Sequence, residues 1–306
     1  MLRVTSNMMN SQLLLNLNRN ARTMNDTQLQ LATGRKLNKP SDDPVGITYS
    51  LRYRAELSSN EQYQKNVDSA ISWLDYNDTV MTQAGDVIQR LREISVQGSN
   101  GTNPQTALDS INAEVKQLKA QLVDIANSQL NGKYIFNGQQ YDAKPFDFPT
   151  GADGMPDTSG AALITTDSGN VNYSVGESVQ LPINVTGSEV FGGVEIDNIF
   201  SIIDRISNAL ASGNITGVSA ELNNIDTRNN KMLSLQADIG AKTNRIELMQ
   251  SRLSDLEVNL TDLQSKTEDG DYAELLMKSK VQENIYNASL SVGSKIIQST
   301  LVDFIR

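Results

Sequence analysis

Apolar residues recur at every third or fourth position over most of the chain, which is the period of an α-helix packed along one side. The pattern is strictest between residues 222 and 265, where one row advances in steps of seven and a second row follows three positions later. The first row consists of Ile225, Met232, Ile239, Ile246, Leu253 and Leu260. Steps of seven are typical of a coiled-coil seam, so we predict one long helix across this segment.

Two earlier periodic runs predict an antiparallel helical hairpin. Val67, Leu74, Met81 and Ile88 lie seven residues apart, and the run from 108 to 125 places an apolar residue at every seam position. The intervening sequence QGSNGTNPQT is rich in turn formers, and its Pro104 favours the start of a new helix. Two helices joined by so short a turn are expected to pack side by side.

Between residues 135 and 197 the period changes to two, which predicts strands. The alternating apolar positions are Val171, Tyr173, Val175, Val179, Leu181, Ile183 and Val185. Four of the seven prolines fall in this segment together with many glycines, as expected for short strands joined by turns. The segment is therefore predicted to be a small β domain inserted between helical arms.

Both ends of the chain are predicted to be helices whose apolar residues cannot all be buried within a single chain. The first helix carries one narrow row, Leu14, Leu17, Ala21, Met24 and Leu31. The last helix carries two, one of Val281, Ile285, Ala288, Val292 and Ile296, and one of Leu290, Ile297, Leu301 and Phe304. A helix with two apolar stripes needs two partners, so we expect neighbouring subunits to supply the second. The candidate assembly interface comprises Leu13, Leu14, Leu17, Met24, Leu31, Val281, Ile285, Leu290, Val292, Ile296, Ile297, Leu301 and Phe304.

Breaks separate both terminal helices from the rest of the chain. In LATGRKLNKPSDDPVGI, residues 31–47, Gly34, Pro40 and Pro44 are expected to end one helix and redirect the backbone. Asp42 and Asp43 are expected to cap the following helix rather than to bind a metal. The second break, TEDGDYAE at 267–274, only faintly resembles a calcium loop and is expected to be solvated.

The order of these elements divides the chain into three regions. Residues 1–40 and 270–306 form paired terminal helices, 41–134 and 198–269 form a helical bundle, and 135–197 form the β-rich insertion. The predicted fold class is mainly α: a long antiparallel coiled-coil bundle with paired terminal helices and a small inserted β domain.

Composition narrows the chemistry that this fold can carry. The 306 residues include no cysteine and no histidine, which excludes disulfides, thiolate nucleophiles, histidine-based triads and the metal sites built from these residues. The net charge is −10, and residues 141–200 carry nine acidic residues and one lysine, which disfavours nucleic-acid binding. No apolar run is long enough to span a membrane, and the start shows no cleavable signal peptide. We expect no catalytic residues, cofactor or metal.

Six stretches stand out beside the periodic pattern. They are MLRVTSNMMNSQLLLNLNRN, LATGRKLNKPSDDPVGI, YIFNGQQYDAKPF, SVQLPINVTGSEVFG, TEDGDYAE and SKIIQSTLVDFIR. In these stretches the chain resembles the bacterial flagellin family. The sequences PSDDPVG and LVDFIR resemble the members at the hook-filament junction more than the filament subunits, whose break reads more like ADDAAG and whose end lacks DFIR.

The resemblance implies a structural, secreted protein of the extracellular flagellum, an adaptor at the hook-filament junction that supports filament assembly and motility. It also implies that the terminal helices line an inner tube, that the acidic insertion faces outward, and that Gly34, Pro40, Asp42, Asp43 and Pro44 form a domain hinge. The implied partners are neighbouring copies in a ring, the other hook-filament junction protein, flagellin and a flagellar export chaperone. The alternatives are a minor filament flagellin, or an adhesin or enzyme displayed on the same scaffold.

Overall fold

The computed structural model describes residues 6–151 and 154–302, and within them the chain is mainly α-helical. The helices are α1 (Ser6–Thr33), α2 (Pro44–Gly98), α3 (Gln105–Ala126), α4 (Gly187–Phe191), α5 (Ile199–Ala211), α6 (Ile215–Glu268) and α7 (Tyr272–Val302). The strands are β1 (Gln129–Leu130), β2 (Lys133–Tyr134), β3 (Asn172–Gly176) and β4 (Val179–Pro182), and a short 3₁₀ turn covers Ala161–Leu163. The predicted fold class, a long helical bundle with a small β insertion, is confirmed.

The chain divides into two compact units. The terminal unit comprises Met1–Asn60 and Asp255–Arg306, and the central unit comprises Glu61–Ser254. The long helices α2 and α6 each contribute residues to both units. No helix of the described chain is long and apolar enough to cross a membrane.

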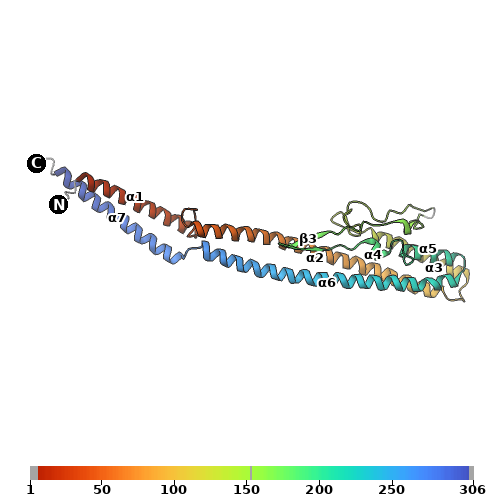
Figure 1. Ribbon diagram of the computed structural model, residues 1–306. Helices are drawn as coiled ribbons and strands as arrows, with labels where there is room; N and C mark the ends of the chain where they lie inside the picture. Colours follow the sequence, from red (N-terminus) through yellow and green to blue (C-terminus); the bar gives the residue numbers. More distant parts are fainter. Residues whose placement is uncertain (1–5, 152–153, 303–306) are drawn as a thin grey trace. The chain divides into compact units, whose positions relative to one another are not determined.

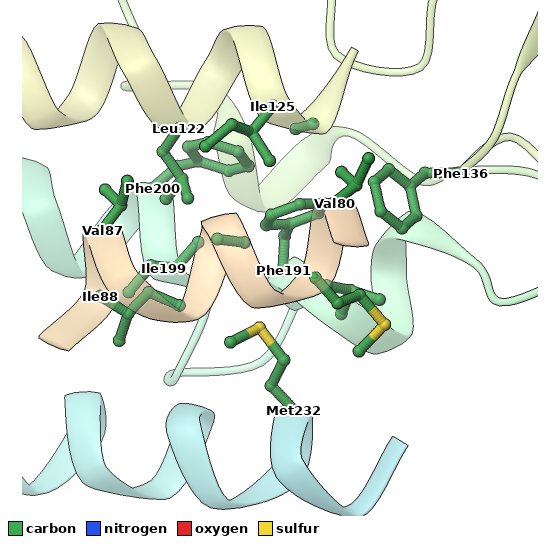
Figure 2. Close-up of a cluster of buried hydrophobic side chains, with 14 of the residues drawn as sticks. Val80, Val87, Ile88, Leu122, Ile125, Phe136, Phe191, Ile199, Phe200 and Met232 are labelled. Atoms are coloured by element: carbon green, nitrogen blue, oxygen red, sulfur yellow. The ribbon is translucent and has the colours of Figure 1, made fainter. Parts of the chain in front are cut away.

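The central unit has an apolar core formed by α2, α3, α5 and α6 (Figure 2). The seven-residue row predicted for α6 is buried throughout this unit, from Ile225 to Leu253. All the seam positions of α3 are buried except Leu118, which is partly buried against the core. Ion pairs join the edges of the seams, with 2.6 Å between Arg92 and Asp226 and 2.7 Å between Arg90 and Glu114. The predicted hairpin is confirmed, with Pro104 as the N-cap of α3.

The insertion holds less sheet than its alternating pattern predicts. β3 and β4 form an antiparallel pair with Tyr173 opposite Leu181, and the ladder ends at Pro182. Ile183 and Val185 are buried but lie outside any strand, so the prediction that the strand continues to Val185 is wrong. The reason is Asn184, whose side-chain oxygen accepts the Val171 N–H at 2.9 Å, a bond that closes a loop instead of extending the ladder.

Aromatic packing and one buried arginine hold the insertion to the helices of the central unit. Phe136, Phe146, Phe191 and Phe200 are fully buried, and the rings of Phe136 and Phe191 meet edge to face at 5.2 Å. Arg228 of α6 is also buried and donates to the backbone oxygens of Glu189 and Asp197, at 2.9 Å each. The insertion is therefore anchored by both apolar and charged contacts.

In the terminal unit, α1 and α7 lie side by side and run antiparallel (Figure 1). The Asn20 side chain donates to the Ser289 hydroxyl at 3.1 Å. Further along the helix pair, Gly293 of α7 lies against Leu13 of α1. A Cβ atom added to Gly293 would lie only 3.0 Å from the Leu13 side chain. The predicted pairing of the terminal helices is confirmed.

Candidate assembly interface

The face of α7 that packs on α1 is mostly polar or small. The least exposed residues of α7 advance in steps of four and three, as a packed helix face does. They are Leu275, Ser279, Gln282, Tyr286, Ser289 and Gly293. Of these only Leu275 is a buried aliphatic side chain, so this helix pair encloses little apolar area.

The large apolar side chains of α7 instead point to solvent. Met277, Val281, Ile285 and Val292 are 46–67% exposed, and they follow one another in steps of four and seven beside the packed face. Leu276 and Leu290 are each 44% exposed. The row from Val281 to Val292, which the sequence presents as the natural seam against the first helix, therefore does not pack on α1. We call Met277, Val281, Ile285 and Val292 the outer stripe of α7.

Helix α1 shows a weaker form of the same arrangement. Its less exposed row includes Leu13, Leu17, Met24 and Leu31, all predicted interface residues, together with the buried Thr27. The prediction that Leu14 belongs to this narrow seam is wrong, because Leu14 is 61% exposed. Leu15 and Met8 are exposed to a similar extent. Thus α1 also leaves apolar side chains without a partner within the described chain.

Four predicted interface residues cannot be placed in the same way. Phe304 lies outside the described residues, and so do the side chains of Ile296, Ile297 and Leu301. The other predicted residues fall into two groups: Leu13, Leu17, Met24 and Leu31 lie within the helix pair, while Leu14 and the α7 residues are open to solvent.

The first break has the local chemistry that its sequence predicts. Helix α1 ends at Thr33, and Gly34 follows with φ of +70°, a left-handed conformation that glycine adopts readily. Helix α2 begins at Pro44, and the Asp43 carboxylate accepts the Val45 N–H at 3.0 Å as an N-cap. Pro40 lies exposed in the intervening turn.

Asp42 does not cap α2, contrary to the expectation. Its carboxylate accepts the backbone N–H groups of Asn38 at 3.0 Å and Lys39 at 2.8 Å, and so closes the turn that precedes the helix. These two backbone hydrogen bonds, first that of Asn38 and then that of Lys39, lower the pKa of Asp42. The adjacent aspartates therefore have separate structural roles.

The two breaks, far apart in sequence, are bound to each other. The Lys36 N–H donates to the Glu268 carbonyl oxygen at 2.7 Å, and the Gly270 N–H donates to the Gly34 carbonyl oxygen at 3.0 Å. The Lys36 ammonium group also donates to the carbonyl oxygen of Lys266 at 2.8 Å. Backbone hydrogen bonds thus join the end of α1 to the end of α6.

The side chain of Glu268 lies at the centre of this junction and is only 2% exposed. Arg54 donates to both carboxylate oxygens, at 2.7 and 2.6 Å, and the Ser50 hydroxyl and the Gln264 amide also donate. Burial alone raises the pKa of this carboxyl, but the hydrogen bonds from Arg54, Ser50 and Gln264 outweigh it and lower the pKa to about 2. We call Ser50, Arg54, Gln264 and Glu268 the Glu268 clasp.

The Glu268 clasp corrects the expectation of a solvated second break, and sequence reasoning missed it. Asp269 and Asp271 are exposed as expected, but Glu268 is not. The available signal was spacing: Ser50 and Arg54 lie four apart on α2, and Gln264 and Glu268 lie four apart on α6. Each pair places two polar side chains on one face of its helix. Nothing in the sequence of either pair shows that it contacts the other pair. Within the described residues no group of three acidic side chains could hold a metal ion.

Known proteins share both the ends and the architecture of this chain. The model of the bacterial flagellin N-terminal helical region matches residues 4–141, and that of the C-terminal helical region matches residues 222–305. The flagellin of Bacillus subtilis is 26% identical over 89% of this chain and 90% of its own length. Flagellar hook-associated protein 3 of Escherichia coli is 25% identical over 85% of this chain and 86% of its own length.

A solved structure has the same fold. Flagellar hook-associated protein 3 of Legionella pneumophila superposes with a TM-score of 0.61 at 18% identity, and the match covers 71% of this chain and 98% of the other. The two matched helical regions contain α1, α2, α3, α7 and most of α6, which together make up most of the chain. The chain therefore belongs to the bacterial flagellin family.

Proposed function

We propose that this protein is a structural subunit of the bacterial flagellum, that it joins hook to filament, and that it assembles through the apolar faces of α1 and α7. It supports filament assembly and motility without enzymatic activity. Its partners are further copies of itself in a ring, the other hook-filament junction protein and flagellin, and an export chaperone holds it before secretion. Its position is outside the cell, between hook and filament.

The observation that carries the assembly role is the reversed pattern of burial in α7. A helix that forms its own core buries its apolar stripe and exposes polar residues. Here Ser279, Gln282 and Ser289 face the partner helix while the outer stripe faces solvent. An apolar face of this length on a soluble chain marks an interaction site. Covering it with equivalent helices of neighbouring copies satisfies both faces of α7.

The junction role is supported by likeness along most of the chain. The match to flagellar hook-associated protein 3 of Escherichia coli covers 85% of this chain. The stretches PSDDPVG and LVDFIR also favour the junction members of the family. A minor filament flagellin is the second candidate, because the flagellin of Bacillus subtilis is similar to an equal degree.

Deletion of the gene, combined with gold labelling of the tagged protein on intact flagella, separates the two candidates. A junction adaptor predicts a single labelled point between hook and filament, and deleted cells that bear hooks and release flagellin into the medium. A minor flagellin predicts label along the filament and near-normal filaments after deletion. Complementation with the unaltered chain is the control, and label along the filament would reject the junction role.

A further inference from the structure

The described methionines of this chain range from fully buried to strongly exposed. In the terminal unit, Met8, Met9 and Met277 are 62%, 46% and 67% exposed. In the central unit, Met81 and Met232 are buried, at 0% and 1%. Among the described methionines, all those with strongly exposed side chains therefore lie on α1 and α7, the helices of the proposed interface.

These three residues occupy both ends of the helix pair. Because Asn20 bonds to Ser289 and Leu13 approaches Gly293, the helices run antiparallel, and Met8 and Met9 lie toward the end of α7. Met277 lies near the start of α7 and so at the opposite end of the pair. It is also the first member of the outer stripe, four residues before Val281. Oxidation of the three would therefore change both ends of the helix pair.

From this placement we propose that Met8, Met9 and Met277 are oxidation sites that control assembly. The proposal rests on the proposed function, because it concerns the two helices of the proposed interface. Hydrogen peroxide transfers one oxygen atom to the thioether: an S–O bond forms, the O–O bond breaks, sulfur loses two electrons, and water is released. The product, methionine sulfoxide, carries a strong hydrogen-bond acceptor where an apolar group was.

The consequence differs between the free chain and the assembly. In the free chain each sulfoxide is hydrated, because its side chain is already open to solvent, so folding is unaffected. In the assembly the sulfoxide is buried against an apolar surface without a donor. Burial of one unpaired polar group weakens an interaction roughly tenfold, so three together should stop incorporation. Methionine sulfoxide reductases with a thiol reductant reverse the reaction, which makes the block reversible.

The test begins with the full-length folded chain and a short treatment with hydrogen peroxide, followed by mass spectrometry of its peptides. Met277, Met8 and Met9 should be oxidised at least about ten times faster than Met81 and Met232, since oxidation follows exposure. Equal rates at exposed and buried positions overturn the proposal. This measurement does not depend on assembly.

The second stage adds treated or untreated chain to flagella that lack the protein and measures incorporation by gold labelling. Untreated chain should be incorporated, treated chain should not, and treatment with the reductases should restore it. Failure of the untreated chain overturns the proposed function and this inference together. Normal incorporation of fully oxidised chain overturns this inference alone.

A variant assigns the effect to these sites. The triple change Met8→Leu, Met9→Leu and Met277→Leu keeps size and apolar character but removes the sulfur atoms, so peroxide should not lower its incorporation relative to the same variant without treatment. Met249→Leu, at a partly buried position of the central unit, is the matched control and should stay sensitive. If the triple variant loses incorporation after peroxide as the unaltered chain does, the assignment is wrong. Met277→Leu alone, which should give partial resistance, serves if the triple variant folds poorly.

Discussion

Helices α6 and α7 follow each other in sequence and both carry a periodic row of apolar residues. The row of α6 is buried in the central unit, whereas the row of α7 is exposed. Within the central unit, Ile225, Met232, Ile239 and Ile246 of α6 are at most 1% exposed. The outer stripe of α7, with a comparable helical period, is 46–67% exposed. Periodicity thus identifies the residues of an apolar stripe but not the chain that covers it. The central unit completes its own core, whereas the terminal unit leaves an apolar stripe open to solvent.

The largest effect should come from placing a charge in the central seam. Ile246→Asp buries a carboxylate at a fully buried position and should lower the free energy of unfolding by at least about 3 kcal/mol. Leu248→Asp is the matched control two residues away, where the side chain is 72% exposed, and should change stability by less than about 0.5 kcal/mol. Urea unfolding measures both, and equal losses would contradict the assignment of the seam.

The contrast between the helices also defines what the sequence could predict. The seams of α3 and α6 were predictable because each row is apolar at nearly every step and is buried by the same chain. The packed face of α7 was not, because Ser279, Gln282 and Gly293 carry no apolar signal. The apolar residues of α7 indicated a stripe, but the pattern does not show which helix covers it. The domain limits and the hinge stay predictions.

The Glu268 clasp marks a second limit of sequence reasoning. Arg54 and Glu268 are 214 residues apart, and nothing local distinguishes Glu268 from the exposed acidic residues beside it. Its burial depends on two backbone segments meeting at the breaks. By contrast, the cap at Asp43 and the left-handed Gly34 were predictable, because both depend only on neighbouring residues.

The next largest effect should come from the Glu268 clasp, whose carboxylate is buried. Glu268→Gln removes the charge that Arg54 and Ser50 bind, and should destabilise the two breaks by about 2 to 3 kcal/mol. Hydrogen exchange of the Lys36 and Gly270 amides reports this locally, because both take part in the hydrogen bonds between the breaks. Both amides should exchange faster.

The matched control for the clasp is Glu274→Gln. Glu274 pairs with Lys278 at 2.7 Å, but both side chains are 59% exposed, so this pair should contribute less than about 1 kcal/mol. The Lys36 and Gly270 amides should keep their exchange rates in this variant. If Glu268→Gln and Glu274→Gln change the exchange rates of these two amides equally, burial of the carboxylate does not determine how much each ion pair contributes to stability.

A smaller and graded effect is expected from acid. The pKa of Glu268 is lowered from its ordinary 4.5 to about 2, so the unfolded chain takes up this proton first as the pH falls. The stability that the clasp contributes should therefore be complete above about pH 4.5 and should disappear toward pH 2. Comparing the unaltered chain with Glu268→Gln across this range isolates the effect from other carboxylates. A stability difference that does not shrink on acidification would show that the charge of Glu268 is not its source.

The smallest effect on folding should accompany the largest effect on assembly. Ile285 is 46% exposed in the outer stripe, so Ile285→Asp should change the free energy of unfolding of the isolated chain by less than about 0.5 kcal/mol. In the proposed assembly the same carboxylate would be buried without a partner, and incorporation into flagella should fail. Asn284→Asp adds an identical charge at the neighbouring exposed position and should be incorporated normally.

Secretion of both variants must be measured, because failure at export would also remove the protein from flagella. If Ile285→Asp is secreted, assembles normally and unfolds much more readily than Asn284→Asp, the outer stripe belongs to the core of the single chain and the contrast between the units disappears.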